Sequence, residues 1–409
     1  MQPATTAHSA LAAGWPQTRL SHGRALWLKA SLLVSFLAAS TAPSPLYALY
    51  REAWGFSALT LTVVFSSYAF ALLTALLVFG SLSDHRGRRE VILAALVLEF
   101  AATLLFWRAD SVAWLLSARV LQGIATGIAT GALSAGLLDL HRERGPLVNG
   151  VAPMIGMAAG AFGTSVLVQF GPAPTRLVFD LLMLVFALQM LAVLYLPETV
   201  QRRPGAWRSL RPRIAIPQRA RAVLWQVLPV NTAQWALGGF YLSLGPTLAK
   251  IVTGNDAPMV GGVLITAMVL SSGVALLAVR QWPPRRALAT GAAALALGLA
   301  VSLAGILLHS TAAFFIGAAV AGLGFGSAFS GSLRSLASLA EPQERASLMA
   351  GFYVLSYLAF SVPAIAAGLS TGLIGLPATA LGLGTVLTLM ASAALLMMGK
   401  RPANPRPEL

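Results

Sequence analysis

The chain has 409 residues, of which 57% are hydrophobic and only 10% are charged. Soluble domains carry about 25% charged residues, so this composition excludes an ordinary soluble enzyme or binding module and indicates a multi-pass membrane protein. The net charge of +15 would favour nucleic acid as a partner in a soluble protein. Here the basic residues lie in short loops between apolar runs, so the charge is read as membrane topology and no nucleic-acid partner is expected. The chain contains no cysteine, which excludes disulfides, thiolate metal sites and thiol catalysis.

The apolar runs predict membrane-spanning helices. Such a helix needs about 20 mostly apolar residues, because each residue rises about 1.5 Å and the hydrocarbon layer is about 30 Å thick. The runs are long and show no period of two, which excludes the strands of a membrane barrel. The sequence therefore predicts an all-α integral membrane protein. Its twelve transmembrane helices are expected at residues 28–49, 57–80, 91–108, 112–138, 147–169, 176–196, 222–250, 258–279, 287–308, 311–337, 347–370 and 376–398.

The basic residues predict the orientation of these spans. The two tails and the loops on one side, with Lys29 counted in the N-terminal tail, hold 23 of the 28 Lys and Arg residues, and the loops on the other side hold four. Since cytoplasmic loops carry an excess of Lys and Arg, both termini are expected in the cytoplasm. Residues 1–27 are interpreted as a polar cytoplasmic tail, because they lack the small-residue cleavage site of a signal peptide. Residues 399–409 are interpreted as a second cytoplasmic tail.

The longest polar segment, residues 197–221, is rich in Arg and Pro and follows the sixth predicted span. As a cytoplasmic central loop it divides the chain into two parts, residues 28–196 and 222–398, with six spans each. The parts resemble each other, since QGIATG at residues 122–127 aligns with AGLGFG at residues 321–326. Two parallel six-helix repeats are the plan of many secondary transporters, so two pseudo-symmetric six-helix bundles are expected.

A dense charged segment, GSLSDHRGRRE at residues 80–90, lies between the second and third predicted spans. It resembles the loop signature of the major facilitator superfamily, G-x-L-[AS]-D-x-x-G-R-[RK], with His85 in place of the usual Arg. Residues 119–123 resemble a second signature of that superfamily, R-x-x-Q-G, and Pro-Glu-Thr at residues 197–199 resembles the end of its sixth span. The resemblance covers the whole chain through its topology. It implies a twelve-span transporter that works by alternating access.

The resemblance also implies a conformational latch between the two halves on the cytoplasmic side. Asp84 would face the N-terminal end of the eleventh span near Ser347, where unpaired N–H groups and the helix dipole favour a carboxylate. Arg88 would pair with Asp139 or Glu143. A loop that only sets topology is the alternative, but acids contribute little to topology, so it does not explain Asp84. The latch residues would be Gly80, Asp84, Gly87, Arg88, Arg89 and Asp139, the glycines allowing close helix approach and a tight turn.

Three ionisable residues are predicted inside spans of the first half, where an unpaired charge is costly: Glu99, Arg119 and Asp180. One hypothesis pairs Arg119 with Glu99 on adjacent helices. The other, which the resemblance favours, directs Arg119 into the central cavity. Glu99 and Asp180 lie in spans that are peripheral in this superfamily, so each is either a locally paired acid or the carrier of one proton per cycle. The predicted spans of the second half contain no Asp or Glu, so a proton-coupling acid must lie in the first half.

The resemblance places a substrate cavity between the halves. Its candidate residues combine aromatic rings with amides and hydroxyls: Tyr68, Gln122, Asn231, Gln234, Trp235, Tyr241, Tyr353 and Tyr357. This mixture favours an uncharged or amphipathic organic molecule. Helix packing or an interfacial aromatic belt is the alternative role for these residues. The fifth span has the small residues of drug–proton antiporters, but it lacks their Gly-Pro-x-x-Gly-Gly pattern, which weakens the prediction of export.

The five histidines lie in tails or loops. No two of them have the spacing of metal ligands, and no cluster of carboxylates accompanies them. Neither an enzyme nor a cofactor or metal is therefore expected. The sequence predicts secondary active transport of a small organic molecule by alternating access, with proton-coupled export preferred and uptake of a metabolite as the alternative. A transporter-like membrane receptor is the alternative from another class. The expected partners are the lipid bilayer, the substrate and protons, and the expected state is a monomer in the plasma membrane.

Overall fold

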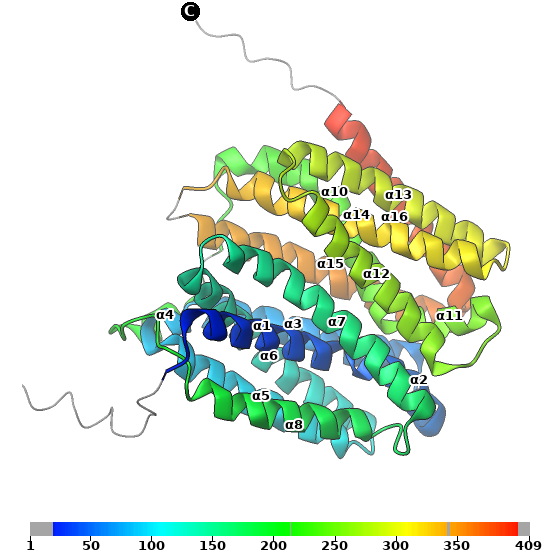
Figure 1. The fold of residues 1–409 in the computed structure, drawn as a ribbon. Coiled ribbons are helices and arrows are strands. Elements are labelled where there is room, and N and C mark those ends of the chain that lie inside the picture. The colour runs from blue at the N-terminus through cyan, green and yellow to red at the C-terminus, as the bar shows by residue number, and fades with distance from the viewer. Residues whose placement is uncertain (1–18, 213, 342–343, 400–409) are drawn as a thin grey trace, which may run out of the picture.

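The computed structural model describes residues 19–212, 214–341 and 344–399, and the regular elements of this part are all helices. Figure 1 labels all of these helices except α9. They are α1 (His22–Thr41), α2 (Pro43–Trp54), α3 (Ala58–Phe79), α4 (Leu82–Arg86), α5 (Arg88–Trp107), α6 (Val112–Leu140), α7 (Arg144–Phe170), α8 (Leu177–Val193), α9 (Ala206–Ser209), α10 (Gln218–Ser243), α11 (Gly245–Thr253), α12 (Pro258–Ala278), α13 (Pro284–Leu307), α14 (Thr311–Ala337), α15 (Arg345–Ile374) and α16 (Leu376–Gly399).

Within the described residues, ten spans are long and apolar enough to cross a membrane, with the run from His22 to Trp54 counted once. The chain is therefore a multi-pass membrane protein. Ten of the twelve predicted spans each coincide with one helix, whereas the first covers α1 and α2 and the seventh covers α10 and α11. The sixth is α8, an apolar helix of 17 residues, and the seventh includes α10, which begins with the polar sequence Gln-Arg-Ala-Arg. Twelve crossings thus remain a prediction that depends on these two helices.

The prolines at residues 43 and 45 predict a bend in the first span, and the structure has it at Ala42, where α1 ends and α2 begins. Pro43 opens α2, and proline has no N–H to continue the hydrogen bonds of the preceding helix. The second half repeats this break at Leu244, between α10 and α11, where Pro246 lies in the first turn of the new helix. The helix breaks therefore follow the internal repeat.

The helices form two groups (Figure 1). Helices α1 to α8 pack among themselves in the lower part of the view, and α10 to α16 pack among themselves in the upper part. Two helix pairs form most of the junction, α3 with α15 and α7 with α12. Residues 194–217 connect the groups at the same end of the molecule as residues 80–88, where many of the basic residues lie. This end is called the basic end below.

Glycine allows close helix approach within the first half. A Cβ atom on Gly123 of α6 would lie 2.4 Å from the Tyr68 carbonyl oxygen of α3, and one on Gly127 would lie 2.5 Å from that of Leu72. One turn further, a Cβ on Gly131 would lie 3.0 Å from the carbonyl oxygen of Gly80. Contacts this short exclude any larger residue unless the helices move apart. The glycines therefore hold α3 against α6, the helix that carries Arg119.

The two halves meet most closely at the end opposite the basic end. There a Cβ on Gly262 of α12 would lie 2.2 Å from Ser165 Oγ of α7, and one on Gly368 of α15 would lie 2.1 Å from Thr62 Oγ1 of α3. Toward the basic end, a Cβ on Gly150 of α7 would meet only the side-chain methyl of Leu276, at 3.1 Å. The junction is therefore tightest away from residues 80–90.

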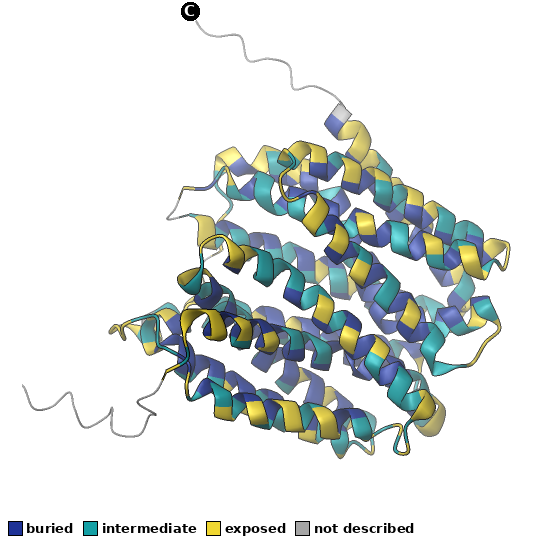
Figure 2. Ribbon diagram, viewed as in Figure 1, coloured by how far each residue is buried: buried dark blue, intermediate teal, exposed yellow. Residues whose placement is uncertain are grey.

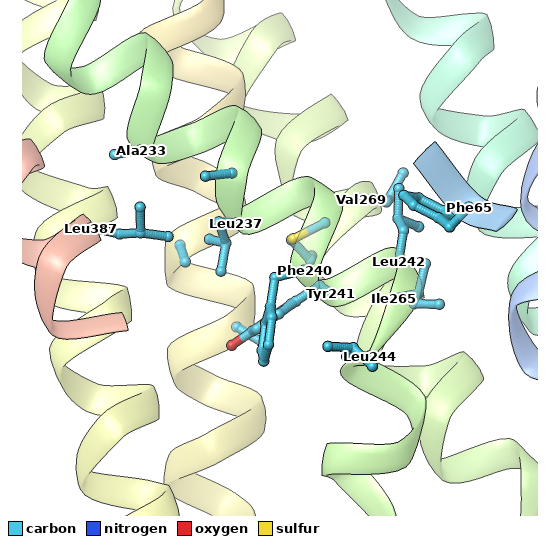
Figure 3. Packing of buried hydrophobic residues seen from close by; sticks show 14 of the residues in the cluster. Phe65, Ala233, Leu237, Phe240, Tyr241, Leu242, Leu244, Ile265, Val269 and Leu387 are labelled. Atoms are coloured by element: carbon cyan, nitrogen blue, oxygen red, sulfur yellow. The ribbon is translucent and has the colours of Figure 1, made fainter. Parts of the chain in front are cut away.

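The distribution of apolar side chains fits a protein surrounded by lipid. In Figure 2 exposed residues follow the outer faces of the helices and buried residues lie between them. On α8, Leu184, Leu188 and Leu191 are 57–61% exposed, and soluble monomers rarely expose contiguous apolar surface of this kind. The buried core crosses the junction: Phe65 of α3 belongs to the same cluster as Leu242 and Ile265 of the second half (Figure 3).

Candidate functional site

Arg88 is the centre of a charged cluster at the basic end. Its side chain is nearly buried, yet it contacts two carboxylates: Nε donates to Asp139 Oδ2 at 3.1 Å, and Nη1 lies 2.5 Å from Asp84 Oδ1. Nη1 also donates to Ser83 Oγ at 2.6 Å. Of the two acids left open by the sequence, the structure pairs Arg88 with Asp139. The cluster joins the loop after α3 to the end of α6, both within the first half.

Glu198, from the Pro-Glu-Thr sequence after α8, completes this cluster. Its carboxylate accepts the backbone N–H groups of Arg88, at 2.9 Å, and of Arg89, at 3.1 Å. These are the first residues of α5, where N–H groups have no partner in the helix and a negative charge is favoured. Sequence reasoning quoted Glu198 only as part of a family pattern. The unpaired N–H groups at the start of a helix were the available signal, because they predict a nearby carboxylate.

Gly87 is required beside this carboxylate for two reasons. Its φ of 104° lies in the left-handed region, which disfavours side chains. A Cβ atom at this position would also lie 2.7 Å from Glu198 Oε2. Gly87 therefore makes the predicted tight turn, and its lack of a side chain leaves room for the Glu198 carboxylate at the start of α5.

The structure does not join Asp84 to the second half. The Asp84 side chain is 54% exposed, and the ion pair that the structure shows for it is with Arg88. The Ser347 carbonyl instead accepts the N–H of Ala215, from the segment that connects the halves, at 3.5 Å. Arg89 is buried and donates to the Leu194 carbonyl at 3.3 Å. In this structure the predicted latch residues thus contact the first half.

Lys29, which the charge count assigns to the N-terminal tail, lies inside α1 and is 1% exposed. Its Nζ donates to the carbonyl oxygen of Gly136, one turn before the end of α6, at 3.0 Å. The C-terminal end of a helix carries partial negative charge, so an ammonium group is favoured there. The predicted first span, residues 28–49, contains Lys29, but its burial could not be predicted, because a single charge beside an apolar run gives no information about burial.

A second polar cluster, called the Arg119 network, lies entirely inside the first half. Arg119 and Glu99 are both 0% exposed. Arg119 Nη1 donates to Gln122 Oε1 at 2.8 Å, and Gln122 Nε2 donates to Glu99 Oε1 at 3.1 Å. Thr126 Oγ1 donates to the other Glu99 oxygen at 3.5 Å. Gln122 therefore bridges the two charged groups, which form no direct ion pair with each other.

The break between α1 and α2 supplies further acceptors to this network. Pro43 has no N–H to donate to the Ala39 carbonyl, and Gln122 Nε2 donates to that carbonyl at 3.0 Å. Arg119 Nη1 donates to the neighbouring Ser40 carbonyl at 2.7 Å, and Arg119 Nε donates to the Tyr47 hydroxyl of α2. The proline break and the buried side chains of α6 thus satisfy each other.

Aromatic rings surround the Arg119 guanidinium. Its central carbon lies 5.3–5.7 Å from the ring centroids of Tyr47, Phe65, Tyr68 and Phe106. These distances are typical of cation–π contacts, which stabilise a desolvated charge. The Nη2 atom is buried and has no hydrogen-bond partner. Arg119 therefore keeps one free donor beside the rings of α3.

The candidates in α10 fall into separate groups. Asn231 Nδ2 donates to Ser356 Oγ of α15 at 3.0 Å, and Gln234 Nε2 donates to Asn231 Oδ1 at 3.1 Å. Tyr241 points toward α13, where its hydroxyl lies 3.3 Å from Ser302 Oγ (Figure 3). The structure thus gives the two amides and Tyr241 partners within the second half.

The remaining aromatic candidates lie together. The ring centroids of Trp235 and Tyr357 are 5.1 Å apart, and those of Tyr357 and Tyr353 are 6.5 Å apart. Asp180 is separate from all of these residues, since it is exposed in the first turn of α8. Within the described residues, no group of three His, Asp or Glu could hold a metal ion.

Two groups of membrane-spanning helices joined along α3, α7, α12 and α15, with a buried polar network in the first group, are the architecture of a helical membrane transporter. The sequence profile of the Major Facilitator Superfamily matches residues 30–298, which is more than half of the chain. The chain therefore belongs to this superfamily of transporters.

Comparison with known proteins adds relatives and structural neighbours. The multidrug resistance protein MdtL of Citrobacter koseri is 27% identical over 290 residues, which cover 67% of this chain and 71% of that protein. MdtL of Salmonella typhi is 30% identical over 115 residues, which are 27% of this chain and only 29% of that protein. Among solved structures, a variant of the nucleoside transporter NupG has a TM-score of 0.72 at 13% identity, and the human organic anion transporter MFSD10 has 0.66 at 18%. Each covers 92% of this chain and 100% of its own, and such identities show a shared fold.

Proposed function

We propose that this transporter exports a small organic molecule in exchange for protons across the plasma membrane. The observation that carries the proposal is the Arg119 network, in which Gln122 connects a fully buried acid, Glu99, to a fully buried Arg119. Ionisable groups at this depth are expensive and are commonly functional. The similarity to a protein named for multidrug resistance supports export as the direction.

Glu99 is the acid that takes the proton in this proposal. As a carboxylate it accepts hydrogen bonds from Gln122 and Thr126, and burial without a direct ion pair disfavours its charged form. Protonation replaces one acceptor with an O–H donor. Gln122 must then rearrange, and the hydrogen bond from Arg119 Nη1 to Gln122 Oε1 changes with it. The proton state of Glu99 thus alters the packing of α6 against α1 and α3.

The junction between the halves supports alternating access. The helices approach closely at Gly262 and Gly368, at the end opposite the basic end, and the latch residues make their contacts within the first half. In the proposed cycle this arrangement is the inward-open state. In the outward-open state, Asp84 turns from Arg88 to the N-terminal end of α15 near Ser347, where the helix dipole favours a carboxylate.

Liposomes that contain the native protein and an internal pH dye test this function. When a transported aromatic drug moves down its own gradient, protons are expected to move in the opposite direction. Proton movement in the same direction as the drug would identify uptake instead. Drug movement without any pH change would reject proton coupling. Binding without movement of either species would indicate a receptor.

The proposed topology can be tested by cysteine labelling, because the native chain has no cysteine. We expect Gln201→Cys, in the exposed segment between the halves, to react with a membrane-impermeant maleimide only from the cytoplasmic side. Asn255→Cys, exposed between α11 and α12, is the matched control and should react only from outside. Labelling of both positions from one side would contradict the twelve-span arrangement, because α10 and α11 would not cross.

A further inference from the structure

An aromatic cluster crosses the boundary between the two halves. Trp235 of α10 lies at its centre, with ring centroids 5.1 Å from Tyr357, 6.0 Å from Phe360 and 6.1 Å from Phe325. The Phe360 ring lies 5.3 Å from Phe65, on α3 of the first half. These five residues are called the Trp235 cluster. It is built from both halves, so a molecule bound to it would contact both moving parts of the transporter.

The cluster is not fully closed by protein. Trp235, Tyr357 and Phe360 are partly exposed, although each lies well inside its helix. Helix α10 packs against α3, α14, α15 and α16, so neighbouring helices cover the rest of these rings. The Nε1 atom of Trp235 is buried and has no hydrogen-bond partner. An unsatisfied N–H group is unfavourable in an apolar setting, and a ligand that carries an acceptor would satisfy it.

The charges around the cluster select against cations. None of the helices that form it, α3, α10, α14 and α15, contains Asp or Glu. Arg119 lies behind the Phe65 ring, 5.7 Å from its centroid, and has a buried Nη2 without a partner. The carboxylate of Glu99 already accepts hydrogen bonds from Gln122 and Thr126. A positive charge at the cluster would therefore lie near the like charge of Arg119, and these helices offer it no acid as a partner.

We propose that the Trp235 cluster binds planar aromatic molecules that lack a positive charge and accept a hydrogen bond from Trp235 Nε1. The rings stack on the ligand, and the N–H group sets its orientation. The Arg119 side of the cluster tolerates a carboxylate and disfavours an ammonium group. This inference rests on the proposed function for its meaning, since the bound molecule is then the transported substrate.

Three probes with one ring system test the charge preference: 1-naphthoate, 1-naphthamide and 1-naphthylmethylammonium. Their affinities for the full-length protein in detergent are measured by equilibrium dialysis. The anion and the amide are expected to bind, and the ammonium probe is expected to bind at least about tenfold more weakly, a difference equivalent to about 1.4 kcal/mol. Equal binding of the ammonium probe, or no binding of any probe, would overturn the proposal.

Substitution of Trp235 tests the hydrogen bond separately from the ring. Trp235→Phe keeps an aromatic ring and removes the N–H donor, so affinity for the anion and the amide should fall about tenfold. Naphthalene has no acceptor and should bind the variant and the native protein alike, which a general loss of structure would not allow. Trp225→Phe is the matched control, because Trp225 is 66% exposed on the same helix. Equal effects of Trp235→Phe and Trp225→Phe on affinity would contradict the proposed hydrogen bond from Trp235 Nε1.

This binding assay uses neither a membrane nor a gradient. Loss of proton coupling in liposomes, with probe selectivity intact, would reject the proposed exchange and leave the binding site in place. Proton-coupled transport with no effect of Trp235→Phe on binding or transport would reject the binding site and leave the proposed exchange in place.

Discussion

Replacing Glu99 with Gln is expected to abolish proton flux triggered by substrate while leaving substrate binding within about threefold of the native affinity. Glutamine is close in size and keeps hydrogen-bonding atoms for Gln122 and Thr126, so the helices around position 99 should stay packed. It cannot gain or lose a proton in the physiological range, so an exchanger that relies on it loses its coupling. The measurement is the rate of internal pH change in liposomes after addition of drug.

Asp180→Asn is the matched control for this experiment. It removes the other acid that sequence analysis placed inside a span, but Asp180 is exposed in the first turn of α8, away from the Arg119 network. Proton flux should remain within about twofold of the native rate, as surface substitutions usually have small effects. If Asp180→Asn stops the flux and Glu99→Gln does not, the coupling acid has been assigned to the wrong residue.

Replacing Arg119 with Leu is expected to lower the free energy of unfolding by about 3–5 kcal/mol, as is usual when one member of a buried polar set is removed. The substitution deletes the donors to the Ser40 carbonyl, the Tyr47 hydroxyl and Gln122 Oε1. These buried acceptors then have no partner. Thermal unfolding in detergent measures the effect, and the Tm of the variant should fall well below that of the native protein.

Arg108→Leu provides the comparison. It makes the same change of side chain, but Arg108 is exposed at the end of α5. Its Tm should stay close to that of the native protein. Arg119→Lys should restore only part of the stability, since an ammonium group carries the charge but lacks the planar fork that reaches several acceptors. Equal Tm values for Arg119→Leu and Arg108→Leu would show that the buried network adds no stability.

The charged segment after α3 shows how far sequence reasoning extends toward the site. Its resemblance to a family signature identified Arg88 as a pairing residue and left Asp139 and Glu143 as partners. The ends of helices are uncertain by a few residues in sequence, and one helical turn decides which acid faces Arg88. In the proposed cycle, contact of Asp84 with α15 depends on the conformational state, which the sequence does not specify.

Composition and local patterning determined the class of this protein. An apolar run long enough to cross a bilayer is visible in a window of about 20 residues, and the excess of Arg in particular loops is equally local. The break after α1 could be predicted for the same reason, since proline acts on its own helix. These properties need no knowledge of which helices are neighbours.

The tertiary structure decided which polar groups meet. Arg119 and Ser40 are 79 residues apart in the sequence, and Arg88 and Glu198 are 110 apart. Lys29 is buried against α6, whereas Asp180 is exposed on α8. A buried polar side chain must find a partner on another helix, and the partner depends on which faces of the helices turn inward. Hydropathy predicts that a helix lies in the membrane, but the packing of its glycines and aromatic rings sets its rotation and therefore its contacts.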